Sequence, residues 1–153
     1  VLVEQKKNVV CYLVGTGKLT NNYKKVVQDL GLKNSIFFEG HVNHKVLPIF
    51  YSASNLFVLP SLNEGTPNVL LEAMGCGIPI VATNVGGVPD LITDNRIGCI
   101  VNPKDSEALA KSISNCIEKD WDSDYIHNTS LKYSNEVQHR LLATHYSKLS
   151  KDS

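Results

Sequence analysis

Short apolar runs alternate with longer amphipathic stretches along the chain, and each run ends at a glycine, a proline or a polar residue. This alternation is typical of an α/β domain with a parallel sheet, in which the runs are strands and the stretches between them are helices. The first run, VVCYLV, is apolar throughout, which favours a strand buried on both faces. The predicted strands are residues 9–14, 36–39, 56–59, 80–82 and 98–101.

The stretches between these runs carry residue types that begin and end helices. Thr66 and Pro67 open one of them, because threonine suits the N-cap of a helix and proline suits its first position. That helix is expected to end at Gly75 or Gly77, and Gly31 is expected to end the first helix, since glycine readily takes the left-handed backbone found after helices. The predicted helices cover residues 18–30, 46–51, 66–75, 88–92 and 106–119.

These elements predict one Rossmann-like α/β domain over residues 1–119, with a parallel sheet and helices on both of its faces. Residues 120–153 are predicted as a C-terminal tail of the same domain, polar at first and helical in its spacing over residues 133–149. The opening VLVEQKKN is typical of the end of a helix whose preceding strand is absent, so the first strand of the domain is expected to be missing. We therefore expect the chain to be part of a longer protein.

Composition and charge narrow the function classes. The 153 residues suffice for one domain with a core, and 15 Lys and Arg balance 15 Asp and Glu, so no net field attracts nucleic acid. The four cysteines are widely spread, without a C-x-x-C pair and without histidines at ligand spacing, which indicates reduced thiols in a cytoplasmic protein and no metal site. No apolar run is long enough to span a bilayer, so we expect a soluble chain.

The segment EGTPNVLLEAMGCGIP carries the most informative chemistry. The first amides of a helix have no partner within the helix, so those of Asn68 and Val69, with that of Thr66 nearby, predict a site for a phosphate-sized anion. At the carboxyl ends of parallel strands, such a site lies where doubly wound folds bind their ligands. Glu64 precedes the helix and Glu72 lies within it, so two carboxylates bracket the predicted anion site.

Glu72 is flanked by apolar residues, and burying a carboxylate is costly unless it has partners. The vicinal hydroxyls of a ribose are donors that would satisfy it. The two glutamates therefore match a sugar on one side of the phosphates and a nucleoside on the other. From the two glutamates alone, the alternative stays open that Glu64 only stabilises the helix dipole and that Glu72 points to solvent.

Four segments belong to one pattern, and the third of them contains the two glutamates, whose spacing is E-x7-E. They are LVGTGKL, FFEGHV, ASNLFVLPSLNEGTPNVLLEAMGCGIPIVATNVGGVPDLI and GCIVNPKDSEALAKSI. Together they resemble the C-terminal, nucleotide-sugar-binding half of the GT-B-fold retaining glycosyltransferases of the family-4 type. In that family the four correspond to a glycine turn, a base-binding turn, the nucleotide-sugar segment, and the closing strand and helix. The resemblance covers residues 9–117.

The resemblance implies a role for each matching residue. Glu64 would contact the hydroxyls of the transferred sugar or support the reacting centre, and Glu72 would bind the ribose hydroxyls. The diphosphate would be held by the segment of Gly65, Thr66, Asn68 and Val69. The base would be lined by Gly40, His41 and Val42. Gly15 would leave room for the backbone to approach the phosphates. No metal or other cofactor is implied, because helix amides and basic side chains neutralise the leaving diphosphate.

The implied parent enzyme transfers a hexose from a nucleotide diphosphate sugar, with retention and through an oxocarbenium-like transition state, to a carbohydrate or lipid-linked acceptor. A Gly-Arg turn and a lysine that clamp the diphosphate in this family, and its acceptor-binding domain, would precede the first residue of this chain. The chain alone is therefore expected to bind nucleotide weakly and to transfer no sugar. The complete enzyme is expected in the cytoplasm, and its peripheral association with a membrane stays open.

Two other functions share parts of this pattern. A sugar-nucleotide epimerase would use a nucleotide half of the same fold, and a binding module could carry a degenerate version of the site. Gly15 and Gly17, with Glu39 ending the next strand, also imitate a dinucleotide-binding fingerprint. The third glycine of that fingerprint is replaced by Thr20, so a tight turn between a strand and a helix is the better interpretation.

Overall fold

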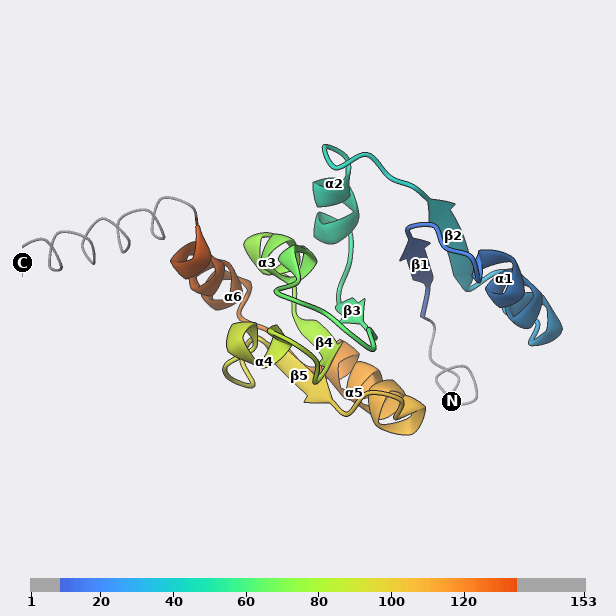
Figure 1. Cartoon of the computed structure of the whole chain (residues 1–153). Coiled ribbons are helices and arrows are strands. Elements are labelled where there is room, and N and C mark those ends of the chain that lie inside the picture. The colour runs from blue at the N-terminus through green and yellow to red at the C-terminus, as the bar shows by residue number, and fades with distance from the viewer. Residues whose placement is uncertain (1–8, 135–153) are drawn as a thin grey trace, which may run out of the picture. The chain divides into compact units, whose positions relative to one another are not determined.

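The computed structural model describes residues 9–134 of the chain (Figure 1). Its elements in chain order are β1 (Cys11–Val14), α1 (Thr20–Asp29), β2 (Ile36–Gly40), α2 (Leu47–Ser52), β3 (Phe57–Leu59), α3 (Asn68–Gly75), β4 (Ile80–Thr83), α4 (Val88–Leu91), β5 (Gly98–Val101), α5 (Ser106–Glu118), α6 (Ser123–Ser130) and the 3₁₀ turn η1 (Leu131–Tyr133). Every strand and helix predicted up to residue 119 is present, with ends at most two residues from the prediction. The predicted helix end at residues 1–8, and most of the predicted helix over 133–149, lie outside the described residues.

The chain separates into two compact units, Val1–Leu47 and Pro48–Ser153. In the first unit β1 pairs in parallel with β2, and α1 connects the two strands. Helix α1 ends as predicted, since Gly31 follows its C-cap with a φ of 69°. The side chains of β1 are exposed, so the prediction of a strand buried on both faces was wrong. A two-stranded sheet beside a single helix offers too little surface to cover both faces of β1.

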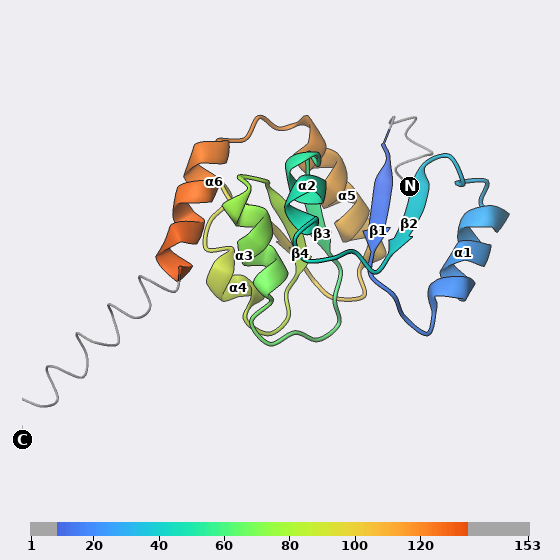
Figure 2. The same ribbon diagram turned by 90° about the horizontal axis from the view of Figure 1, so that it is seen from above.

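The second unit is built on a three-stranded parallel sheet in the order β3-β4-β5. The central strand β4 is buried along its whole length, as its apolar sequence IVAT favours. Helices α3 and α4 pack on one side of this sheet, and α5 packs on the other (Figure 2). Gly98 allows β4 and β5 to approach closely, because a Cβ atom there would lie 2.1 Å from the carbonyl oxygen of Ile80.

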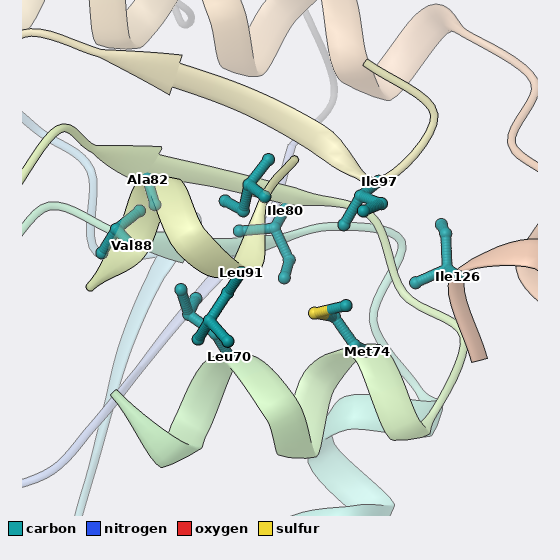
Figure 3. Packing of buried hydrophobic residues seen from close by; sticks show 9 residues of the cluster. Leu70, Met74, Ile80, Ala82, Val88, Leu91, Ile97 and Ile126 are labelled. Carbon is teal, nitrogen blue, oxygen red and sulfur yellow. The ribbon is translucent and has the colours of Figure 1, made fainter. Parts of the chain in front are cut away.

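The core of the second unit lies between β4, α3 and α4 (Figure 3). Its members are fully or almost fully removed from solvent, and they come from four elements and the loop between α4 and β5. They are Leu70, Met74, Ile80, Ala82, Val88, Leu91, Ile92, Ile97 and Ile126. Burial of such side chains stabilises a domain by about 1.5–3 kcal/mol each, so this cluster dominates the stability of the unit and holds α3 against the sheet.

Helix α6 was not predicted, because the segment that begins at Asp120 is polar and SDYIHNTS offers few apolar positions. Its one large aliphatic side chain, Ile126, is fully buried in the core. The hydroxyl of Tyr125 donates a hydrogen bond of 2.7 Å to Asp94, and Nδ1 of His127 lies 2.7 Å from the carbonyl oxygen of Gly75. These contacts hold α6 against the end of α3 and against the loop between α4 and β5. Within residues 9–134, no helix has the length and apolar character needed to cross a membrane.

Candidate functional site

The residues from Glu64 to Glu72 lie where β3 gives way to α3, at the carboxyl end of the second unit's sheet. Helix α3 begins at Asn68, and its N-cap is Pro67 with non-helical angles (φ −77°, ψ 104°). The predicted N-cap, Thr66, is therefore one residue too early. No N-cap side chain accepts a hydrogen bond from the first turn, whose amides at Asn68 and Val69 have no acceptor within the helix.

Glu64 is half-buried in the loop before α3, and its carboxylate is held by a neighbour in that loop. The hydroxyl of Ser61 donates a hydrogen bond of 2.6 Å to Oε1 of Glu64. The backbone carbonyl of Ser61 in turn accepts a hydrogen bond from the hydroxyl of Thr83, a buried residue at the end of β4. The position of the Glu64 carboxylate is thus tied to the central strand through two hydroxyl groups.

The turn between β4 and α4 packs directly against the backbone of Glu64. Gly86 has a φ of 51°, and a Cβ atom on it would lie 2.0 Å from the carbonyl oxygen of Glu64. The amide of Gly87 donates a hydrogen bond of 2.7 Å to the carbonyl oxygen of Gly65. The sequence marked this glycine pair only as a break between elements, whereas the structure makes it part of the support of the Glu64 loop. Two adjacent glycines after a buried strand were the signal for this close approach.

Glu72 lies in the middle of α3 and is half-buried. Its Oε2 atom accepts a hydrogen bond of 3.0 Å from the hydroxyl of Tyr51, which is only 7% exposed. Burial and, after it, the hydrogen bond to Glu72 raise the pKa of Tyr51 above its ordinary value, so the phenol remains a protonated donor at neutral pH. The alternative in which Glu72 simply points to solvent does not describe this carboxylate.

The other predicted site residues belong to the first unit, where the ends of β1 and β2 bring Gly15 and Gly40 together. The amide of Gly15 donates a hydrogen bond of 2.7 Å to the carbonyl oxygen of Gly40. Both have left-handed backbone, with φ of 121° and 66°, which a residue with a side chain rarely adopts. His41, which is exposed, and Val42, which is half-buried, follow β2. The predicted site residues are therefore distributed over two units, four in the first and six in the second.

The four cysteines are free thiols. Sγ of Cys116 lies 3.4 Å from Sγ of Cys99, and burial, followed by that contact, raises the pKa of Cys116 to about 12. Within the described part of the chain, no three His, Cys, Asp or Glu side chains are grouped so that they could hold a metal ion. The independence of the site from metals stays a prediction.

A family model described as "Glycosyl transferases group 1" matches residues 1–136. An uncharacterized glycosyltransferase of Methanocaldococcus jannaschii is 30% identical over 129 residues, which are 84% of this chain and 33% of that protein. A UDP-Gal:alpha-D-GlcNAc-diphosphoundecaprenol alpha-1,3-galactosyltransferase of Escherichia coli is 33% identical over 105 residues, or 68% of this chain and 27% of that protein. The structure of HepE from Anabaena in complex with UDP is similar with a TM-score of 0.74 and 27% identity, over 91% of this chain and 41% of that one.

These matches confirm the predicted fold class, which is one Rossmann-like half of a GT-B fold. They also confirm the resemblance that rests on the E-x7-E segment and its neighbours. The chain spans a third or less of the length of these two relatives and about two-fifths of the solved structure. The roles of individual residues are not addressed by these similarities and stay a prediction.

Proposed function

The chain belongs to the group 1 glycosyl transferases, and from this premise we propose that it is the donor-binding half of a retaining hexosyltransferase. In this proposal the complete enzyme transfers a hexose from a nucleotide diphosphate sugar to a carbohydrate or lipid-linked acceptor. The name of the Escherichia coli relative, with UDP-galactose as donor and a diphosphoundecaprenol-linked acceptor, supports both the hexose and the lipid-linked acceptor.

The observation that carries the proposal is the pair of held carboxylates on either side of an uncapped helix N-terminus. Glu64 lies in the loop before α3, and Glu72 lies one turn into the helix. The Glu64 carboxylate accepts a hydrogen bond from the hydroxyl of Ser61, and the Glu72 carboxylate accepts one from the hydroxyl of Tyr51. The positive end of the helix between them favours an anion, and the amides there suit phosphate oxygens. Two such carboxylates suit the hydroxyls of two different sugars, one on each side of a diphosphate.

We assign the roles as follows. The segment formed by Gly65, Thr66, Asn68 and Val69 holds the diphosphate. Glu72 binds the ribose hydroxyls, and Glu64 contacts the transferred sugar or supports its reacting centre. In the first unit, the left-handed glycines at the ends of β1 and β2 supply a turn without side chains. Gly15 leaves room there for phosphate oxygens, and the base lies against Gly40, His41 and Val42.

The proposed chemistry needs little from the protein beyond charge and position. As the bond between the sugar and the diphosphate breaks, negative charge grows on the diphosphate, and the amides at the start of α3 stabilise it. The sugar becomes oxocarbenium-like, and a half-buried carboxylate such as Glu64 stabilises its positive charge. The acceptor hydroxyl then attacks from the face that the diphosphate leaves, which retains the configuration of the sugar, and its proton passes to an oxygen of the departing diphosphate.

The test of this function uses the complete protein that contains this chain, incubated with UDP-, GDP- and ADP-hexoses and with sugar and lipid-linked acceptors. The expected product is a glycoside with the anomeric configuration of the donor, and Glu64→Gln should abolish its formation. Release of an epimerised sugar without acceptor would instead identify an epimerase. Absence of any product, together with absence of nucleotide binding, would identify a degenerate module. The expectation that the 153-residue chain alone binds nucleotide and transfers no sugar remains a prediction for the same assay.

A further inference from the structure

We propose that Tyr51 is a positioning residue of the nucleotide site: its hydroxyl holds the Glu72 carboxylate in place for the ribose and thereby sets the preference for ribonucleotides over 2′-deoxyribonucleotides. The inference rests on the proposed function, in which Glu72 accepts hydrogen bonds from the ribose hydroxyls. Tyr51 lies near the end of α2, outside the E-x7-E segment, and is 21 residues from Glu72 in sequence.

The ring of Tyr51 has little freedom to move. It is 7% exposed, and it makes a T-shaped contact with Phe57 of β3, with 5.5 Å between the ring centroids and 73° between the ring planes. The carbonyl oxygen of Phe50, in the last turn of α2, accepts a hydrogen bond of 2.6 Å from the hydroxyl of Ser54. A buried ring that is fixed in this way places its hydroxyl at one point, and that point is 3.0 Å from Oε2 of Glu72.

This contact restricts the rotamers that the Glu72 side chain can adopt. A glutamate on a helix surface has three side-chain torsions, and ordering them when a ligand binds lowers the affinity. A donor that orders the carboxylate before the ligand arrives removes that loss. The Tyr51 phenol stays protonated, because burial and the hydrogen bond to the Glu72 carboxylate raise its pKa. It therefore donates, and Glu72 accepts.

A role of Tyr51 in packing alone predicts different behaviour. The ring is buried and contacts Phe57, and both features survive when only the hydroxyl is removed. Under a packing role, Tyr51→Phe would leave the discrimination between ribose and deoxyribose unchanged. Under the positioning role, the loss of the hydroxyl lowers affinity for the ribonucleotide more than affinity for its 2′-deoxy analogue, which has only one of the two hydroxyls that Glu72 accepts from.

The experiment measures dissociation constants of the 153-residue chain by NMR titration. UDP, GDP and ADP are compared first, and the tightest of them is then titrated beside its 2′-deoxy analogue into the wild type, Tyr51→Phe, Glu72→Ala and the double variant. The wild type should prefer the ribonucleotide by about tenfold, since the 2′-deoxy sugar lacks one hydrogen bond to a charged acceptor. Tyr51→Phe should reduce this ratio to about threefold, and Glu72→Ala should remove it. The double variant should match Glu72→Ala, because both changes act through one carboxylate.

Tyr125→Phe is the matched control. It also removes one phenol donor to a carboxylate of the second unit, the 2.7 Å bond to Asp94, but it lies on α6 rather than beside Glu72. Its ribose preference should equal that of the wild type, and thermal unfolding of each variant reports any loss of stability. A Tyr51→Phe variant with the wild-type ratio, beside a Glu72→Ala variant that has lost it, would overturn the positioning role and leave the proposed function intact. A wild-type chain that does not distinguish ribose would overturn the ribose role of Glu72 and with it the positioning role. A chain that binds none of the three nucleotides would overturn the nucleotide site itself.

Discussion

Replacing Gly86 with alanine tests whether the turn after β4 positions the loop that carries Glu64. The added Cβ atom would lie 2.0 Å from the carbonyl oxygen of Glu64 and 2.7 Å from its carbon, and 2.8 Å from the carbonyl oxygen of Gly65. All three are backbone atoms, so no flexible side chain can give way. Because such contacts are not found below 3.0 Å, the loop must move by about 1 Å or the turn must open by the same amount.

The energetic effect has two parts. Holding alanine at a φ of 51° disfavours the native turn by about 1–2 kcal/mol, and the overlap with the loop adds about 1–3 kcal/mol. We therefore expect Gly86→Ala to lower the free energy of unfolding by about 2–5 kcal/mol. The displaced Glu64 loop also leads directly into the first amides of α3. Nucleotide binding should weaken by about tenfold, which corresponds to the loss of one charge-assisted hydrogen bond.

Gly87→Ala is the control for this change, because it adds the same methyl group one residue later. Its Cβ atom would lie 3.1 Å from the carbonyl oxygen of Gly65 and 3.2 Å from the hydroxyl of Thr66, and its φ is not left-handed. Shifts of a few tenths of an ångström relieve both contacts, so the loss of stability should stay below about 1 kcal/mol. Its amide can still donate to Gly65.

Both variants are measured by urea unfolding, followed through the fluorescence of the single tryptophan, Trp121, and by nucleotide titration in NMR. Trp121 is half-buried, and its indole N–H donates to the carbonyl oxygen of Cys116, so its emission reports the fold of the second unit. Equal urea midpoints and equal nucleotide affinities for Gly86→Ala and Gly87→Ala would show that the turn does not support the loop, and would refute this reasoning.

Three further changes test other parts of the account. Ser61→Ala removes the donor to Oε1 of Glu64 and should lower kcat of the complete enzyme by about tenfold with little change in KM, as steady-state kinetics would show. The hydrogen bond from Tyr125 is the main reason that the pKa of Asp94 is lowered to about 2, so its stabilisation is present above the ordinary pKa of 3.8 and is lost as pH falls through 2. The difference in urea midpoint between wild type and Asp94→Asn should accordingly shrink from pH 5 to pH 2, and a constant difference would contradict the shift. Ile126→Ala should lower the free energy of unfolding by about 2–5 kcal/mol, whereas an effect below about 1 kcal/mol would mean that α6 is only a tail.

The pattern of apolar runs predicted the strands well, because each run is short, apolar and closed by a turn residue. The prediction that β1 is buried on both faces was wrong. A run such as VVCYLV indicates a strand, but it does not indicate how many neighbouring elements cover that strand. The helix α6 escaped prediction for the opposite reason. Its place in the fold depends on one buried side chain, Ile126, and on polar contacts to distant loops, and neither gives a periodic signal.

The candidate site shows the same division between local and distant features. The spacing of Glu64 and Glu72 around a helix start is local and could be predicted from the sequence. The hydroxyl that holds Glu72 comes from Tyr51, and the backbone of the Glu64 loop packs on Gly86, 22 residues further along the chain. Such contacts depend on how α2, α3 and the turn after β4 pack on the sheet, which the sequence pattern does not specify. The shift of the N-cap to Pro67 depends on that packing as well, because Pro67 is buried.

The most direct test of the central claim is an NMR titration of the 153-residue chain with UDP, GDP and ADP, repeated with Glu72→Ala. A nucleotide-binding site at the start of α3 predicts chemical-shift changes in the amides of residues 66–72 and 40–42, stronger for one base and lost in the variant. Shifts elsewhere in the chain, shifts that persist in Glu72→Ala, or no shifts at millimolar nucleotide would contradict the claim.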